Sequence, residues 1–348
     1  MRIFSYRNKR TLRRIALIVL LAAVLLGLLI LARISYLGRY AVYSPDGVYF
    51  DKTQKLQRAP QTPADTPDAE EYPFETILSA AAEETETDPN AVQLQGFYIS
   101  TTMLANSVDE VRQALADADG YNAVLIDVKS PLGNFYYSTD IADAQTADAD
   151  IAACDALIKE LTETPDLIVI ARVPAFSDPN FVAKHYSSAL TTKSGDLWMD
   201  ERRCYWLRPD SLDARSYLAA IALELDARGF DEVLFDNFTV PDDDSVAWDT
   251  EAITPVAALE DCAENLTANL TGSSIRLALG TSVPSVAQYA SRVFVTTERA
   301  NDVLSVTDAM TEVLPDPATQ LVFVTTSHDT RFDASGVIRP LLGDSSGE

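Results

Sequence analysis

Short apolar segments alternate with helical segments over most of this chain, from about residue 95 to about residue 325. Each apolar segment is hydrophobic almost throughout rather than at every second position. This is expected for the strands of a parallel sheet that helices cover on both faces. We therefore predict strands at 96–101, 123–129, 167–173, 232–238, 275–280, 292–297 and 320–325.

Strand units of this number, in a region of about 250 residues, fit an α/β fold of the (β/α)8 TIM-barrel type better than an open doubly wound sheet. The pattern is weaker in its second half, so the barrel is expected to be irregular there, and the eighth strand is not located. No Gly-x-Gly-x-x-Gly or P-loop follows any strand. The class of nucleotide-binding Rossmann domains is therefore disfavoured.

The helices between the strands carry boundary signals. Ser107 and Glu110 have the spacing of a capping box at the start of a helix, and Gly120 is placed to end it. A second helix is expected at 152–161, and a longer one ends at Gly229. These boundaries support the alternation of strands and helices.

An unbroken apolar run, Ile15 to Ala32, follows a basic tail at residues 1–14. As a helix the run spans roughly 27 Å, close to the thickness of the hydrocarbon core of a bilayer. We predict a single transmembrane anchor in the cell membrane, with a cytoplasmic N-terminus and an extracytoplasmic remainder. The alternatives are a cleaved signal peptide, which usually has a shorter apolar region and a small-x-small cleavage site, and a buried helix of a soluble domain.

The segment at 33–93 joins this anchor to the barrel. Pro, Thr, Ala, Glu and Asp are frequent in it, so it can bury little apolar surface and is interpreted as an acidic spacer. A hairpin is expected near its start, at 40–50. The barrel domain then occupies 94–330, and 331–348 is interpreted as a C-terminal tail.

The charge balance restricts the partners. The chain has 27 basic and 52 acidic residues, and its net charge is −25 although the N-terminal tail is basic. A surface this acidic excludes nucleic acid and anionic membrane surfaces as main partners of the barrel, because both attract positive charge. A solvated acidic coat explains the composition most simply. Binding of calcium or of a cationic polymer is the alternative.

Three isolated cysteines and two histidines limit the possible cofactors. The cysteines have neither the spacing of a zinc site nor that of a disulfide framework, although one bridge among them stays possible. No metal site and no tightly bound cofactor is expected.

Polar residues stand where the predicted strands end. In a TIM barrel this edge carries the working groups. The strand ends supply Asp127, Lys129, Arg172, Asp236 and Asn237, and Glu298 follows a later strand.

Two carboxylates that face one substrate are the minimum apparatus for cleaving a glycosidic bond. We predict that Asp236 is the ionised partner, with its pKa lowered by Arg172 and Lys129, and that Asp127 or Glu298 is the acid. The alternative is a cluster of ion pairs that only closes the top of the barrel.

A long insertion follows the third strand and contains Trp198, Tyr205 and Trp206 in a polar setting. It is expected to form a hairpin over the barrel mouth, where the faces of Trp198 and Trp206 could stack on sugar rings. Packing of these rings against the barrel rim is the alternative.

Four segments resemble a known group of bacterial proteins, the "putative glycoside hydrolase" domain family of α-amylase-like TIM-barrel type. They lie at 122–133, 168–179, 194–211 and 227–241, and the resemblance covers about 96–330. It implies a TIM barrel, a polysaccharide substrate and an N-terminal export or anchoring segment. Asp127, Lys129, Arg172 and Asp236 match the family pattern.

The chain departs from this family in three places. Ser130 and Pro131 stand where an acidic pair is usual, Thr239 replaces an arginine, and the stretch near 296–298 differs. The second catalytic carboxylate is therefore not assigned by the resemblance. Two hypotheses follow: an anchored glycoside hydrolase acting on envelope or environmental polysaccharide, or a non-catalytic barrel that binds envelope glycan or a protein partner.

Overall fold

The structure is a computed structural model that describes residues 41–44, 47–50 and 92–342. The chain divides into two units, Met1–Ala81 and Ala82–Glu348.

In the first unit, β1 (Ala41–Ser44) and β2 (Gly47–Phe50) pair in antiparallel fashion, as expected for the hairpin at 40–50. The basic tail at 1–14 and the apolar run at 15–32 lie outside the described residues. Where the chain is described, none of its helices has the length and apolar character needed to cross a membrane.

The second unit contains a closed barrel of eight parallel strands, which confirms the predicted fold class. Around the barrel the strands follow the order β10-β11-β12-β3-β4-β7-β8-β9. The ladder continues in parallel through β9, β10, β11 and β12, so the second half is not irregular. The barrel strands are β3 (Gln95–Ile99), β4 (Ala123–Asp127), β7 (Ile168–Pro174), β8 (Glu232–Asp236), β9 (Arg276–Gly280), β10 (Arg292–Thr296), β11 (Leu321–Val324) and β12 (Gly336–Pro340).

The eighth strand, β12, lies in the segment that was interpreted as a tail, and that boundary was wrong. β12 pairs with β11 on one side and with β3 on the other, and so closes the barrel. Its side chains Val337 and Ile338 are buried. Only these two of its five residues are strongly apolar, which is why the pattern of apolar runs did not reveal it.

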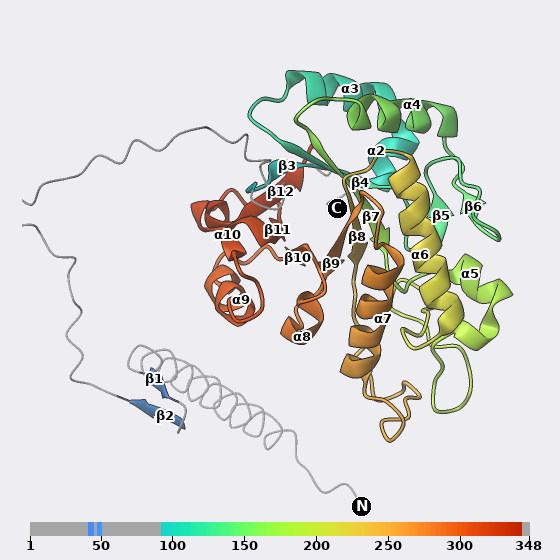
Figure 1. Cartoon of the computed structure of the whole chain (residues 1–348), viewed down its shortest axis with the longest axis vertical. Helices are drawn as coiled ribbons and strands as arrows, with labels where there is room; N and C mark the ends of the chain where they lie inside the picture. The colour runs from blue at the N-terminus through green and yellow to red at the C-terminus, as the bar shows by residue number, and fades with distance from the viewer. Residues whose placement is uncertain (1–40, 45–46, 51–91, 343–348) are drawn as a thin grey trace, which may run out of the picture. The chain divides into compact units, whose positions relative to one another are not determined.

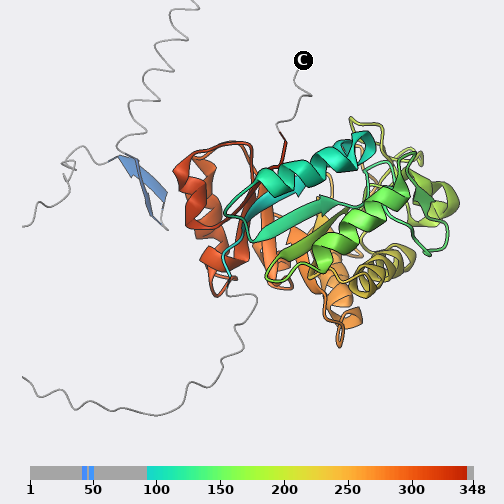
Figure 2. The same cartoon turned by 90° about the horizontal axis from the view of Figure 1, so that it is seen from above.

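Helices surround the strands in the two views of Figure 1 and Figure 2. Ser107 accepts a hydrogen bond from the backbone N–H of Glu110, as the capping box predicted. Gly229, with φ of +86°, follows the end of α6, the longest helix among the described residues. The α-helices are α2 (Thr101–Asn106), α3 (Val108–Asp117), α4 (Ile151–Thr162), α5 (Pro179–Lys184), α6 (Leu212–Ala227), α7 (Pro255–Asn269), α8 (Pro284–Ala287), α9 (Asp302–Met310) and α10 (Pro317–Gln320).

Alternate residues of the strands pack into different apolar clusters, because successive side chains of a strand point to opposite faces. In β7, Ile170 belongs to one cluster, whereas Val169 and Ala171 belong to another. β8 repeats this with Leu234 in the first cluster and Val233 in the second. The first cluster fills the barrel, and the second joins the strands to the surrounding helices.

A buried ion cluster joins the starts of three neighbouring strands. Glu232, Arg276 and Arg292 are the first residues of β8, β9 and β10. Arg276 Nη2 lies 2.8 Å from Glu232 Oε1, and Arg292 Nη1 donates to the same oxygen. The side chains of Glu232 and Arg292 are fully buried. This cluster therefore closes the barrel at the end opposite to the carboxyl ends of the strands.

Candidate active site

The carboxyl ends of three adjacent strands bring together three charged residues that the sequence predicted for the site. β7 lies between β4 and β8, and its residues Arg172 and Pro174 are in register with Asp127 and Asp236. A cavity of about 320 Å³ opens there. Its lining residues are Thr101, Asp127, Lys129, Pro131, Arg172, Pro174, Arg202, Asp236, Asn237 and Thr296.

Asp127 and Arg172 form an ion pair in a two-point arrangement. Arg172 Nη2 donates to Asp127 Oδ2 at 2.9 Å, and Arg172 Nε donates to the other carboxylate oxygen. The guanidinium also lies over the ring of Tyr98, 5.4 Å from its centre. Burial opposes the charge of Arg172, but the Asp127 carboxylate holds its pKa above the ordinary value. The two side chains thus form a pair of opposite charges at the edge of the cavity.

Asp236 lies in a different environment. Its carboxyl group packs against Gly280 of β9, where an added Cβ would come within 2.6 Å of Oδ1. Burial raises the pKa of Asp236, and the nearby Asp127 charge acts in the same direction. The charge of Arg172 and the backbone N–H of Asn237 act the other way without reversing the shift. The predicted lowering of the pKa of Asp236 is therefore wrong, because loss of hydration outweighs the attraction of Arg172.

Asn237 holds the turn after β8 with φ of +51°, a left-handed conformation that asparagine tolerates better than most residues. Its side chain is exposed at the cavity.

Lys129 is bound to a partner that the sequence did not indicate. Its Nζ lies 3.0 Å from Asp178 Oδ2, and both side chains are 1% exposed. It also donates to the carbonyl oxygen of Ser177 at 3.2 Å. The hydroxyl of Tyr217 donates to the same Asp178 oxygen at 2.7 Å. The expectation that Lys129 acts on Asp236 is therefore not supported, since its charge is compensated by Asp178.

Glu298 is exposed and does not line the cavity. Its Oε2 accepts hydrogen bonds from the hydroxyls of Thr325 and Thr326, and its Oε1 accepts one from the backbone N–H of Thr326. Burial acts to raise the pKa of Glu298, but these hydrogen bonds outweigh it and lower the pKa. A carboxyl group with a lowered pKa is a poor general acid, so the structure disfavours Glu298 for that role.

The tryptophans predicted to stack on sugar pack against the insertion and the loop after β8 instead. Trp198 is 8% exposed, lies with Leu190 and Val246, and donates from Nε1 to Asp243. Trp206 is half-buried, donates to Asp200, and meets Trp198 edge-on. Neither ring lines the cavity. The alternative of structural packing therefore describes both residues better.

The expected hairpin of the insertion is present as a short antiparallel turn. Met199 and Tyr205 form a bridge, and Asp200 Oδ1 accepts a hydrogen bond from the backbone N–H of Cys204. The turn places Arg202 at the cavity, together with Thr101 and Thr296 from the barrel. These three residues were missed. The threonines stand at strand ends, where position alone could have indicated them, whereas Arg202 depends on how the insertion folds back.

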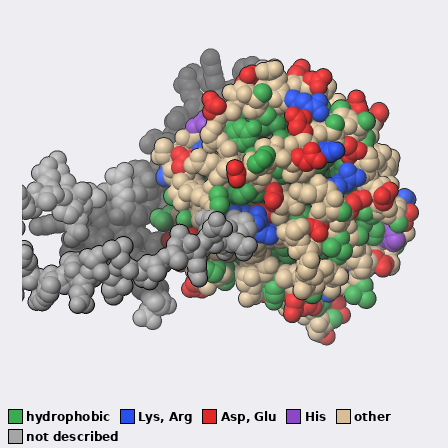
Figure 3. Space-filling view, turned by 45° about the horizontal axis from the view of Figure 1, so that its top comes forward, with side chains coloured by type: hydrophobic (Ala, Val, Ile, Leu, Met, Phe, Trp, Pro, Cys, Tyr) green, Lys and Arg blue, Asp and Glu red, His purple; other side chains and the backbone are tan. Residues whose placement is uncertain are grey.

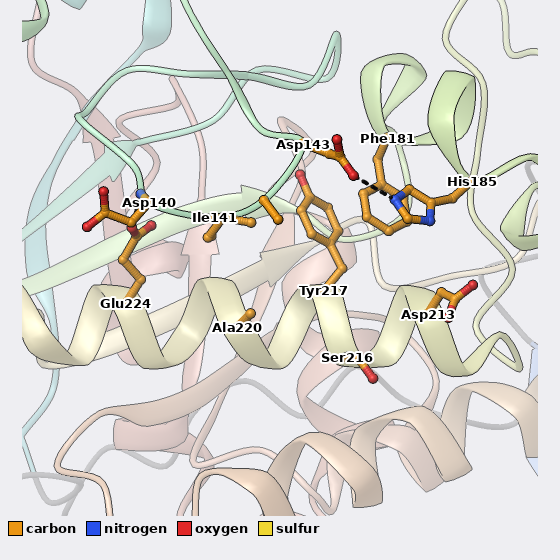
Figure 4. Close-up of a pocket in the computed structure, with 11 residues that line it drawn as sticks. Asp140, Ile141, Asp143, Phe181, His185, Asp213, Ser216, Tyr217, Ala220 and Glu224 are labelled. Carbon is orange, nitrogen blue, oxygen red and sulfur yellow. Dashed lines mark hydrogen bonds and ion pairs between the residues drawn. The ribbon is translucent and has the colours of Figure 1, made fainter.

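A larger groove, of about 640 Å³, lies on the outer side of α6 (Figure 4). Several of its carboxylates already have partners within the protein. Asp143 lies 3.3 Å from both Lys184 and His185, and Glu224 accepts a hydrogen bond from the hydroxyl of Tyr137. The groove contains none of the charged strand-end residues. The smaller cavity at the barrel mouth is therefore the better candidate for chemistry.

Over the part of the chain that the structure describes, no three His, Cys, Asp or Glu side chains are grouped so that they could hold a metal ion. Cys154, Cys204 and Cys262 are buried as free thiols, and burial raises the pKa of Cys154 to about 11. None of the three cysteines lines the cavity at the barrel mouth.

Residues 96–291, more than half of the chain, match the family described as "Putative glycosyl hydrolase domain". A parallel eight-stranded barrel with acidic residues at its strand ends is the class of protein that the fold and the site define. The chain belongs to this family, which confirms the resemblance seen in its sequence motifs.

Three solved structures illustrate the similarity. A hypothetical protein of Ruminiclostridium thermocellum is 24% identical over 52% of this chain and 96% of that one, with a TM-score of 0.45. Ega3 of Aspergillus fumigatus, in complex with galactosamine, is 14% identical over 72% of this chain and 92% of that one, with a TM-score of 0.46. The glycoside hydrolase domain of PelA from Pseudomonas aeruginosa is 14% identical over 67% of this chain and 83% of that one, with a TM-score of 0.42. No curated protein matches the chain in sequence.

Proposed function

We propose that the barrel hydrolyses glycosidic bonds of a polysaccharide, with Asp236 as the general acid and Asp127 as the ionised carboxylate. One observation carries this proposal: two carboxyl groups line one cavity in opposite environments. Arg172 pairs with Asp127 through two hydrogen bonds, whereas burial raises the pKa of Asp236. Pairs of carboxyl groups whose surroundings favour different protonation states are the basis of glycosidase chemistry.

In this mechanism Asp236 donates its proton to the oxygen of the leaving sugar as the bond to the anomeric carbon breaks. Asp127 either attacks that carbon directly or removes a proton from the attacking water. The net reaction adds one water molecule across the bond, and Asp236 recovers its proton. Thr101, Asn237 and Thr296 line the cavity and supply groups that can hydrogen-bond to sugar hydroxyls.

A non-catalytic function is the second candidate, and one observation favours it. Both oxygens of Asp127 already accept hydrogen bonds from Arg172. A carboxylate held in this way is a natural element of a rigid binding surface. The same cavity would then bind a glycan without cleaving it.

Hydrolysis of a polysaccharide panel by the full-length protein separates these candidates, with released reducing ends as the readout. We expect the wild type to release sugar, and Asp236→Asn and Asp127→Asn to reduce the rate by at least about 100-fold. Glu298→Gln is the matched control and should keep most of the activity. Turnover that survives Asp236→Asn would remove Asp236 from the mechanism. Binding without release by the wild type would support the second candidate.

The anomer formed first then defines the role of Asp127. Retention of configuration, followed by NMR, assigns Asp127 as the nucleophile, and inversion assigns it as the base that activates water.

We further propose that the apolar run at 15–32 anchors the protein in the cell membrane, with the barrel on the extracytoplasmic side. The residues before the run include several Lys and Arg but no Asp or Glu, which supports this orientation. Full-length protein should stay with the membrane fraction after an alkaline wash, and protease added to intact spheroplasts should digest the barrel. A barrel that is protected until the cells are lysed would contradict the proposed orientation.

A further inference from the structure

Arg202 differs from the other cations of the cavity because, among residues 92–342, no carboxylate forms an ion pair with it. It is exposed and lines the cavity. Its position is nevertheless defined. Asp200 Oδ1 accepts from Cys204 N at 2.8 Å, and Arg203 N donates to the Asp200 carbonyl oxygen at 2.9 Å. Arg202 therefore stands in an ordered turn that the insertion presents to the barrel mouth.

The remaining charges of the cavity compensate one another. Arg172 is paired with Asp127 through both carboxylate oxygens. Lys129 is paired with Asp178 at 3.0 Å in a buried contact. Asp236 is the last carboxyl group of the lining, and its burial favours the neutral form. The charge of Arg202 acts to lower the pKa of Asp236, but burial outweighs this attraction, and among residues 92–342 Arg202 is left without an ion pair.

This local charge contrasts with the rest of the molecule. The chain has a net charge of −25, and Figure 3 shows acidic side chains spread over the face of the barrel domain that is in view. Such a surface repels anionic polymers in general. A neutral glycan needs only hydrogen-bond donors, which uncharged side chains also supply, so it does not account for an arginine without an ion pair at the cavity. A positive group in a recessed site attracts anions locally even when the whole protein is negative.

We infer that this cavity accepts a glycan carrying an anionic substituent, a carboxylate or an ester phosphate or sulfate, and that Arg202 recognises that substituent. The planar guanidinium matches such oxyanions through two parallel hydrogen bonds, which lysine cannot form. The inference rests on the proposed function only in taking this cavity as the sugar site. It holds whether the glycan is cleaved or only bound.

Binding to matched pairs of oligosaccharides tests this inference with the full-length protein in detergent at low salt. Each pair consists of an acidic oligosaccharide and its neutral parent: an oligogalacturonate with its carboxyl-reduced form, and a sulfated and a phosphorylated oligosaccharide with their unsubstituted forms. We expect the wild type to bind at least one acidic member at least about 10-fold more tightly than its parent. The preferred pair identifies the substituent.

Variants at position 202 assign the preference to the guanidinium. Arg202→Gln should reduce the preference for the acidic member by about 10- to 100-fold, and Arg202→Lys should keep part of it. Arg299→Gln removes an exposed arginine that does not line the cavity and should leave the preference unchanged. Thermal unfolding confirms that each variant is folded.

The inference is overturned if no acidic member binds more tightly than its parent, or if Arg202→Gln keeps the preference. These results differ from a failure of the proposed hydrolase function. A retained preference without any turnover contradicts the hydrolase alone. Turnover of neutral glycans, together with no preference for any acidic member, contradicts this inference alone.

Discussion

At the scale of single residues, Asp236 and Asp127 should affect stability in opposite directions. Because burial raises the folded-state pKa of Asp236, its contribution to stability is fully present below the unfolded-state pKa of about 3.9 and is lost as pH rises through the folded-state pKa. The variant Asp236→Asn has no carboxyl group to ionise at this position, so it does not lose this stability as pH rises. We therefore expect the variant to have a higher Tm than the wild type at pH 7, and a smaller difference at pH 4, by circular dichroism.

Asp127→Asn is the matched comparison, since it makes the same change at the other carboxyl group. It removes the negative charge that Arg172 binds through two hydrogen bonds. We expect a loss of about 2 to 3 kcal/mol at pH 7, because hydrogen bonds to charged groups are stronger than neutral ones. Equal shifts of Tm in the two variants would contradict the view that the two carboxyl groups have different environments.

The buried ion cluster at the other end of the barrel yields a second prediction. Arg292→Leu leaves Glu232, which is fully buried, with one cation fewer. Removing one partner of a buried ion pair costs about 3 to 5 kcal/mol. Urea denaturation should show this as a lower midpoint with an unchanged slope.

Arg299→Leu is the control for this substitution, since Arg299 forms an exposed ion pair with Asp302. A surface pair contributes about 1 kcal/mol or less, so its removal should shift the midpoint little. A similar shift in both variants would mean that the cluster does not hold the strand starts together.

The positions of the site residues were more predictable from the sequence than their protonation and their ion-pair partners. Asp127, Arg172 and Asp236 could be placed because parallel strands end at one edge of the barrel, and this follows from the strand pattern alone. The direction of the pKa shift of Asp236 could not be predicted from the strand pattern, because it depends on how far the neighbours of Asp236 exclude water. The partner of Lys129 could not be predicted either, since Asp178 lies in the insertion, at the start of α5.

At the scale of elements, the turn that carries Arg202 depends on Asp200. Its two carboxylate oxygens accept hydrogen bonds from the backbone N–H of Cys204 and from Nε1 of Trp206. Asp200→Ala removes both, at about 1 kcal/mol each. The turn should then open about 5 to 30 times more often.

Limited trypsin digestion measures this opening, because the turn contains Arg202 and Arg203. Mass spectrometry should show faster cleavage after these residues in Asp200→Ala than in the wild type. Asp196→Ala, at the neighbouring exposed turn, is the control and should leave the rate of that cleavage unchanged. If Asp200→Ala cleaves no faster, the turn is held by contacts other than those of Asp200.

Strands differ in how visible they are in the sequence. β4, β7 and β8 are buried along nearly their whole length, so each is a run of apolar residues that stands out from its surroundings. β12 ends in Arg339 and Pro340, which are only half-buried, and it follows a short 3-10 helix (Thr330–Ala334) rather than a long amphipathic helix. The closing strand therefore lacks both signals by which the others were found.

At the scale of the whole molecule, β12 decides whether the barrel is closed. It bonds to β11 and to β3, and Val337 N donates to the carbonyl oxygen of Leu94 at 2.8 Å. Its removal opens the edges of β11 and β3 and takes away the buried side chains of Val337 and Ile338, each worth about 1.5 to 3 kcal/mol of burial. Because a domain is stable by only about 5 to 15 kcal/mol, loss of the strand should abolish cooperative unfolding.

Two truncated chains test this closure. A chain that ends at Ser335 lacks β12 and should be insoluble or unfold without a transition in circular dichroism. A chain that ends at Leu342 keeps β12 and the hydrogen bond from Leu341 N to Tyr98 O, and should unfold within about 2 °C of the full-length protein. A cooperative transition in the shorter chain would mean that the remaining strands form a stable open sheet. The carboxyl ends of β4, β7 and β8 could then form the site without a closed barrel.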